Sequence, residues 1–383
     1  MKAISWIGSA IIFLSGAASA NAQLSVQMKQ AAGAAMADVV VHVTYINSGA
    51  VALSIPERGL PRVLQDGRLW NDAFLVVSQD GDAAAYRGII AHLSAAAREK
   101  TLTLEPGQRL VRQVNLSLNY ELRPGQTYKI SAPILRYRIL DGTGAAGAAA
   151  IDKEASTSPV SMLIVAPLPR AGRRAETAPQ EASRVASRVA SCPPARLKEV
   201  TAGIAAAAGI ARSSKNYMES LYGYEFGESS IIVTFKETAR YRSWFGEHGD
   251  PNIANPVNDR IRKTVSGVAT RFALLKQPSC DCPEEMVGDT NAWISTAVPY
   301  VVNYCPRFFD LPVGPNVPSG SKAATIYHEV THFSDTFALG TSDLDEQFPS
   351  PEDARYVART ARDLASEHSY GYEYFADNHG NEN

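Results

Sequence analysis

The chain lacks both a strong excess of charge and a long apolar run. Its 383 residues carry 37 Lys and Arg against 39 Asp and Glu, which leaves a net charge of −2. Because proteins that bind nucleic acids or anionic membranes usually present a basic surface, this balance argues against both partners. The apolar stretch around residues 11–14 is too short to cross a bilayer and no second one follows, so we expect no membrane span.

The first residues have the composition of a secretory signal. Lys2 supplies a positive charge, the apolar residues 11–14 follow, and small residues at 18–20 and 20–22 offer cleavage sites. We predict that residues 1–22 are a signal peptide and that the mature protein is secreted or periplasmic.

Cysteine is scarce and confined to the second half of the chain, at Cys192, Cys280, Cys282 and Cys305. An even count in an exported chain predicts two disulfides, for which three pairings exist. Cys280 and Cys282 are poorly placed to bond each other, because an extended C-x-C sends both side chains the same way. Our first choice is Cys192–Cys280 with Cys282–Cys305. The spacing also differs from the C-x-x-C of a zinc knuckle.

Residues 23–165 contain no cysteine and only two histidines, His42 and His92, so we expect no hydrolytic site there. Short apolar or alternating segments recur at 39–45, 51–55, 74–77, 102–104, 111–118, 128–130 and 162–165. Turn signals separate several of them, for example Glu105-Pro106-Gly107-Gln108. This spacing predicts a β-sandwich that serves as a folding or binding module.

Residues 166–191 have almost no large apolar side chain and are rich in Pro, Arg, Ala and Ser. Such a composition is typical of an exposed linker that proteases can reach. The linker is either a passive spacer or a processing segment. No lysine occurs between Lys153 and Lys198.

The pattern becomes helical from about residue 192. Apolar residues at helical spacing predict one helix or two consecutive helices over 197–221 and another helix over 261–275. Residues 231–233 and 289–304 have the composition of strands, and the latter could offer an edge for an extended peptide. Ser350, Pro351 and Asp353 predict a capped helix start.

His328-Glu329-Val330-Thr331-His332 reads H-E-x-x-H in a chain with only 7 histidines. On a helix beginning near residue 319, positions i and i+4 lie on one face, so both imidazoles can reach one metal ion. Two neutral histidines, a third protein ligand and one open position suit catalytic zinc. Glu329 is turned away from the histidine line and can act as general base.

The third ligand has four candidates: Asp335, Asp343, Asp345 and Glu373. Asp335 lies too close to His332 to fold back easily. Gly340 allows a sharp turn after the helix, and such a turn can return a carboxylate to the metal. Spacing alone does not separate Asp343 from Asp345.

Several motifs over residues 192–378 resemble the aspzincin metallopeptidases, the family of deuterolysin and peptidyl-Lys metalloendopeptidase. Gly340-Thr341-Ser342-Asp343 resembles the G-T-x-D that follows H-E-x-x-H in this family. Residues 240–246 are similar to its R-Y-x-x-W-F-G segment, residues 280–282 to its C-x-C, and residues 373–376 to its E-Y-F-A. Residues 23–165, with the E-P-G-Q turn, resemble the immunoglobulin-like propeptide of bacterial members.

The resemblance implies one zinc ion held by His328, His332 and Asp343, with Glu329 as base, and the disulfide pairing chosen above. It implies a mainly helical α+β zincin domain over 192–383 behind an all-β immunoglobulin-like module. The family tyrosine after the aspartate is replaced by Glu346, and an insertion would carry its role in stabilising the oxyanion to Tyr356. An ordinary tyrosine on a helix face is the alternative for Tyr356.

Two further residues belong to the substrate site that the resemblance implies. Glu373 matches an acidic residue of the lysine-selective members, which place an Asp three residues earlier, where this chain has Tyr370. A structural carboxylate is the alternative for Glu373. We therefore predict substrate binding by Glu373 and Tyr370, with a preference for lysine at P1′ that one carboxylate would enforce less strictly than two.

The sequence thus predicts a secreted zinc endopeptidase that acts on protein or peptide substrates. Residues 23–165 would be its propeptide, which acts either as an intramolecular inhibitor or as an aid to folding. The alternative is a secreted binding protein without catalysis, in which the metal domain is a degenerate relative.

Overall fold

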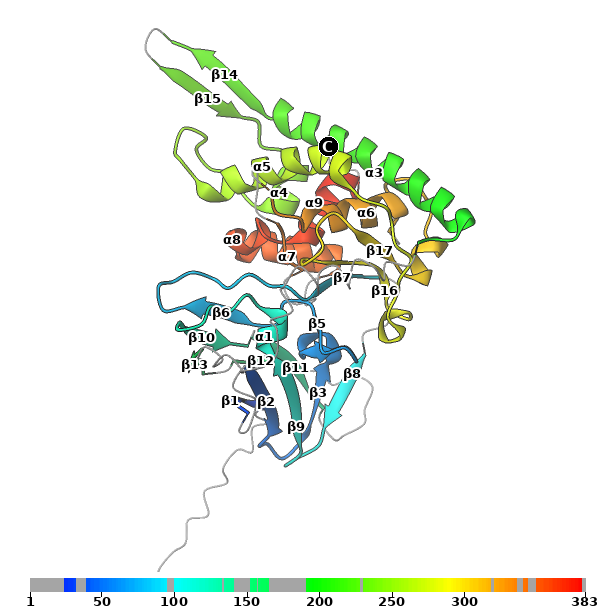
Figure 1. Cartoon of the computed structure of the whole chain (residues 1–383). Coiled ribbons are helices and arrows are strands. Elements are labelled where there is room, and N and C mark those ends of the chain that lie inside the picture. Colours follow the sequence, from blue (N-terminus) through cyan, green and yellow to red (C-terminus); the bar gives the residue numbers. More distant parts are fainter. Residues whose placement is uncertain are drawn as a thin grey trace, which may run out of the picture.

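The computed structural model describes residues 24–31, 39–94, 100–132, 134–140, 152–156, 158–164, 191–227, 230–317, 320–335, 340–343 and 349–380. The predicted signal peptide and nearly all of the predicted linker lie outside these residues. Figure 1 shows a β-rich part, coloured blue to green, below a helix-rich part, coloured green to red. Among the described residues, no helix combines the length and the apolar character that crossing a bilayer requires.

The β-rich part contains three antiparallel sheets of its own. Their strands alternate inward and outward side chains; in β2, for example, Val41, Val43 and Tyr45 are buried in the core of this part. The strands are β1 (Leu24–Gln30), β2 (Val40–Asn47) and β9 (Arg109–Asn115); β12 (Asp152–Ala155), β11 (Leu135–Leu140), β3 (Ala52–Pro56) and β8 (Thr101–Leu104); and β13 (Val160–Leu163), β10 (Thr127–Ser131) and β6 (Leu75–Ser78). The short helix α1 (Leu116–Asn119) follows β9. The all-β character is as predicted, and the immunoglobulin-like sandwich stays a prediction.

The helix-rich part is built around α6, which carries the H-E-x-x-H motif and is buried along its whole length. The predicted helix over 197–221 is one helix, α3, and α3 packs against α6. The helices are α3 (Pro194–Ser220), α4 (Ala239–Phe245), α5 (Pro256–Arg271), α6 (Lys322–Thr331), α7 (Pro351–Thr360), α8 (Arg362–Ala365) and α9 (Ser369–Asp377). The predicted strand at 231–233 is β15 (Ile231–Phe235), paired with β14 (Tyr222–Phe226) in a hairpin that projects from the body (Figure 1). Short 3-10 turns occupy Glu57–Gly59, Phe272–Leu274, Glu284–Met286 and Pro306–Asp310.

Local chemistry explains how two of these helices begin and pack. The side chain of Ser321 accepts a hydrogen bond from the backbone of Ala324 at the start of α6. Ser350 and Asp353 form the predicted capping box of α7. Gly203 lets α3 pack closely on α6, because a Cβ there would lie 2.9 Å from the side chain of Ile326. The motif helix is therefore held from its first turn and along one side.

One further sheet contains strands from both parts. The sequence did not predict this shared sheet. Its order is β17 (Val302–Tyr304), β16 (Thr290–Ser295), β7 (Ile89–Leu93), β5 (Leu69–Trp70) and β4 (Arg62–Val63). Strand β7 comes from the β-rich part, runs antiparallel to β16, and places His92 opposite Ala292. Apolar side chains from both parts pack around it, including Trp70 and Trp293. The two parts therefore share a continuous sheet and a buried cluster.

Two disulfides fasten the segment next to β16 and β17. Cys192 is bonded to Cys280, and Cys282 is bonded to Cys305. This is the predicted pairing, and none of the four cysteines is free. The first bond ties the start of α3 to this segment, and the second ties the segment to the residue that follows β17.

Candidate metal centre and substrate cleft

His328 and His332 lie one helical turn apart on α6, with ring centroids separated by 4.9 Å. A sharp return of the chain brings Asp343 to them. Gly340 permits this return, because a Cβ at that position would lie 2.0 Å from the carbonyl oxygen of His332. The backbone N–H of Thr341 donates to the carbonyl of Thr331 at 3.1 Å and closes the turn. The glycine-led turn therefore acts as expected from the sequence.

The facing atoms of these three side chains form the geometry of a cation site. Asp343 Oδ1 lies 3.0 Å from His328 Nε2 and 3.4 Å from His332 Nε2. All three side chains are buried, and none of these atoms has a hydrogen-bond partner among the described residues. Because buried polar atoms are rarely left unpaired, such a convergence fits a shared ion. Two imidazole nitrogens and one carboxylate oxygen are a donor set that zinc accepts.

The opposite ring nitrogens are engaged, which leaves Nε2 of each histidine free to bind an ion. His328 Nδ1 donates to Glu373 Oε2 at 3.0 Å, and His332 Nδ1 donates to the carbonyl oxygen of Thr341 at 3.0 Å. Hydrogen bonds of this kind set the tautomer and the ring orientation of metal-binding histidines. Burial lowers the pKa of His332 to about 4, so this ring is neutral at neutral pH.

The other candidates for the third ligand lie elsewhere. Asp335 pairs with Arg271 at 2.8 Å, and Asp345 lies outside the described residues. Glu373 contacts the Nδ1 side of His328 and not its Nε2 side. Among the described candidates, the structure therefore brings only Asp343 to both histidine Nε2 atoms.

Glu329 lies beside this group with a buried carboxylate. Neither of its oxygens has a hydrogen-bond partner among the described residues. Burial raises the pKa of Glu329 well above its usual value, which favours proton uptake by this carboxyl. The backbone of His92 faces the same carboxyl and opposes that rise. A buried carboxyl with a raised pKa is suited to accept and return a proton.

The two tyrosines singled out from the sequence have different surroundings. Tyr356 lies on α7, is 45% exposed, and has the guanidinium of Arg136 5.5 Å from its ring centroid. No contact between Tyr356 and the metal-centre residues occurs within the described part of the chain. Tyr370 is buried, and its ring centroid lies 4.4 Å from that of His328. Burial raises the pKa of Tyr370, so its hydroxyl keeps its proton at neutral pH.

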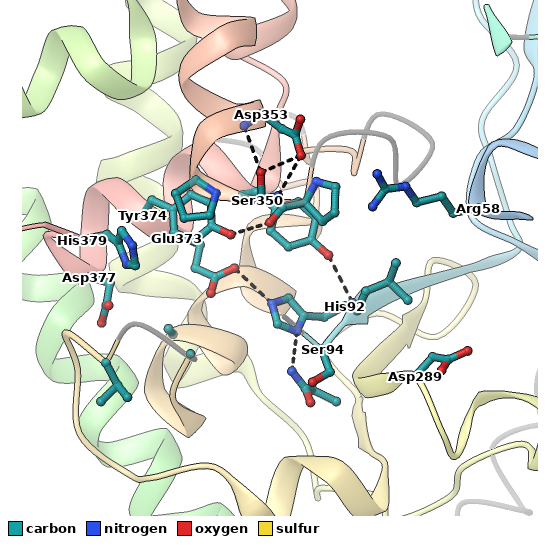
Figure 2. A pocket seen from close by; sticks show the side chains of 18 of the residues that line it. Arg58, His92, Ser94, Asp289, Ser350, Asp353, Glu373, Tyr374, Asp377 and His379 are labelled. Carbon is teal, nitrogen blue, oxygen red and sulfur yellow. Dashed lines mark hydrogen bonds and ion pairs between the residues drawn. The ribbon is translucent and has the colours of Figure 1, made fainter. Parts of the chain in front are cut away.

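His92 is a site residue that the sequence reasoning missed. Its Nε2 lies 3.1 Å from Glu373 Oε2, and its Nδ1 lies 3.2 Å from the side-chain amide of Asn291 (Figure 2). Burial alone would raise the pKa of Glu373, but the nearby His92 and the hydrogen bonds from His328 and His92 lower it to about 2. The sequence did not indicate that His92 belongs to the site, because 281 residues separate it from Glu373.

A cavity of about 360 Å³ opens beside this contact, between the two parts of the chain. Figure 2 shows Glu373 and Asp377 of α9 on one side and Arg58 on the other. Asp377 was also missed, although it follows Glu373 by four residues and such a pair shares a helix face. Burial raises the pKa of Asp377 to about 7. Together with Asp353 of α7, the cavity thus has three carboxyl groups from helices in its lining.

Comparison with known proteins agrees with this geometry. Residues 234–377 match the model of the aspzincin family, described as lysine-specific metallo-endopeptidase. The chain is similar to an extracellular protease of Aeromonas hydrophila, with 27% identity over 353 residues and 90% of both chains covered. The solved structure of a zinc peptidase from Grifola frondosa covers 49% of this chain and 97% of its own, with 22% identity and a TM-score of 0.38.

The segment that matches the family model contains the complete histidine and carboxylate set together with Glu329 and Glu373. The segment over residues 234–377 is similar in sequence to the aspzincin metalloendopeptidases, and the protein is a peptidase.

Proposed function

We propose that this protein is an exported zinc endopeptidase made as a two-part precursor. The observation that carries the proposal is the convergence of His328, His332 and Asp343 beside the buried carboxyl group of Glu329. The extracellular protease of Aeromonas hydrophila and the two disulfides support export.

In this proposal His328 Nε2, His332 Nε2 and one Asp343 oxygen hold one zinc ion. Bound zinc would supply Lewis-acid polarisation of the scissile carbonyl and a lowered pKa of the attacking water. Glu329 takes the proton of the attacking water, because its buried carboxyl lies beside the three proposed ligands. It then returns the proton to the leaving amine, which needs one to depart.

Strand β16 offers the edge on which a peptide substrate would lie in extended form. In the precursor this edge is paired with β7, whose residue His92 also contacts Glu373. A substrate and β7 cannot occupy the same edge together. The N-terminal part is therefore proposed to act as an intramolecular inhibitor until it is displaced.

Tyr356 is proposed as an oxyanion donor only for the processed enzyme. Its ring lies under Arg136 of β11, a residue that leaves with the N-terminal part. Donation to the site requires Tyr356 to move toward the metal centre after that release. Loss of one oxyanion donor typically costs roughly a hundredfold or more in rate.

A preference for a basic side chain at P1′ follows from the carboxyl groups of the cavity. Glu373 and Asp377 both line it, so a lysine ammonium would meet two acidic side chains. The linker residues 166–191 contain arginine and no lysine. Strict lysine specificity would therefore require another protease to process the linker, whereas looser specificity would allow self-processing.

A cleavage profile on a peptide library tests the proposal, with processed protein assayed before and after treatment with a zinc chelator. We expect cleavage that the chelator abolishes and added zinc restores, with basic residues enriched at P1′. N-terminal sequencing of the secreted form would show whether residues 23–165 are removed. Absence of cleavage from a zinc-loaded, processed protein would favour the non-catalytic binding protein instead.

A further inference from the structure

Tyr370 contacts strand β7 through its hydroxyl, which accepts a hydrogen bond from the backbone N–H of Leu93 at 3.1 Å. The tyrosine is 1% exposed and stands in the first turn of α9, with its ring packed edge-on against His328. The hydroxyl is therefore held at a defined place between the metal centre and β7.

Strand β7 runs past the site as an extended peptide would. It is antiparallel to β16, with Ile90 opposite Ile294 and His92 opposite Ala292. The His92 backbone faces the Glu329 carboxyl, and its side chain contacts Glu373. With Glu373 taking the P1′ side chain, as proposed above, His92 corresponds to P1′ and Leu93 to P2′ of a substrate.

The N–H of Leu93 points away from β16. The neighbouring N–H of Ser94 donates to the carbonyl oxygen of Asp289, the residue before β16, at 2.8 Å. Successive N–H groups of an extended chain face opposite edges. A substrate in the same alignment would direct its P2′ N–H away from β16, where Tyr370 is the observed acceptor. Without this acceptor, a buried N–H would lose its hydrogen bond on binding.

We propose that Tyr370 binds the main chain of the substrate by accepting the P2′ N–H, in the position now held by Leu93. This inference rests on the proposed peptidase function. It adds that the enzyme selects substrates by a main-chain group, the P2′ N–H, as well as by the P1′ side chain. Peptides without a P2′ N–H, such as those with proline or an N-methylated residue there, are then poor substrates whatever their P1′ side chain.

A cycle of two enzymes and two peptides tests this role. Processed wild-type enzyme and Tyr370→Phe are each assayed on a peptide with leucine at P2′ and on the same peptide with N-methyl-leucine. Conformational effects of the methyl group are common to both enzymes and cancel in the ratio. We expect N-methylation to lower kcat/KM about fivefold more for wild type than for Tyr370→Phe, the effect of one hydrogen bond.

Tyr372→Phe is the matched control. Tyr372 lies on the same helix, is fully buried, and donates its hydroxyl to the carbonyl of Ser366, away from β7. N-methylation should cost this variant as much as it costs wild type. Mass spectrometry must show that both peptides are cut at the same bond, and zinc content must match across the variants.

The same cycle on dissociation constants, measured with Glu329→Gln as background, needs no turnover. This arm separates the inference from the proposed function, because peptide binding can be measured even if wild type proves inactive. Equal losses for the tyrosine and phenylalanine proteins in the binding cycle would overturn the role of Tyr370. A loss confined to the tyrosine protein would support it.

Discussion

The β-rich and helix-rich parts contribute to the site in different ways. The proposed ligands, the base, and Glu373 and Asp377 of the cavity all come from the helix-rich part. The β-rich part supplies β7, which covers the edge of β16 and brings His92 to Glu373. In the proposed function, the catalytic groups thus come from one part, whereas access of substrate to them depends on both.

The packing of β7 explains why access would be controlled firmly. Ile90 is buried in the core of the helix-rich part, while Ile89 and Ala91 join a cluster with Trp293. An interface of this kind resembles a domain core, so cutting the linker alone leaves most of its contacts in place. The N-terminal part is therefore expected to stay bound after cleavage until it unfolds or is digested.

The largest expected effect separates catalysis from folding within the helix-rich part. Glu329→Gln keeps the size of the side chain but removes its ability to take a proton. We expect peptidase activity to fall about 10²–10⁴-fold, with zinc content and melting temperature close to wild type. Substantial turnover by a zinc-loaded variant would contradict the assignment of Glu329 as base.

Breaking the contact between the two parts should raise activity. Ile90→Asp places a charge in the shared core without changing a metal-centre residue, and an unpaired buried charge costs several kcal/mol. We expect uncleaved Ile90→Asp to hydrolyse a short peptide about 10–100-fold faster than uncleaved wild type. Kinetic assays on gel-verified, uncleaved protein measure this effect.

Val111→Asp serves as the control for that experiment. Val111 lies in β9 of the same part and is 44% exposed, so a charge there meets water. Its activity should equal that of the uncleaved wild type. If Ile90→Asp loosens the strand, as limited proteolysis would show, yet stays inactive, then β7 is not the element that blocks the site.

The variant Glu373→Gln distinguishes a role of this carboxylate in zinc binding from a role in substrate specificity. Because it accepts the Nδ1 proton of His328, its loss should weaken zinc binding by about 10–100-fold, as measured by competition with a chelator. A variant that binds zinc normally and only raises KM for lysine substrates would instead make Glu373 a specificity residue.

The smallest expected effect concerns the pH dependence of stability. The pKa of Asp377 is near 3.8 in an unfolded chain and about 7 in the fold, so between these values the folded state binds more protons. This group therefore makes stability fall as pH rises from about 4 to 7. Asp377→Asn should remove that contribution and raise the melting temperature at pH 7 relative to wild type by a few degrees, roughly 2–4 °C per kcal/mol.

Thermal unfolding of both proteins at pH 4, 5, 6 and 7 measures this difference. The asparagine keeps an oxygen that can accept the hydrogen bond now donated by the Asn316 backbone. Parallel curves for the two proteins would show that Asp377 ionises in the fold as it does in water.

Much of the site follows from short-range rules that a sequence displays. The i, i+4 spacing puts His328 and His332 on one face, and Gly340 allows the chain to return after α6. The Ser350 capping box and the disulfide pairing were likewise predicted and confirmed. The separation of Asp343 from Asp345 came from the family resemblance, since spacing alone left both open.

The sequence by itself thus placed His328, His332 and Glu329 on one helix and indicated a β-rich and a helix-rich part, because helix periodicity, turns and caps act over a few residues. Only the tertiary structure decided that Tyr370, rather than Tyr356, packs beside His328, and that β7 joins β16 with His92 against Glu373. Contacts between residues up to 281 positions apart depend on the packing of whole sheets and helices. No local pattern of residues encodes them.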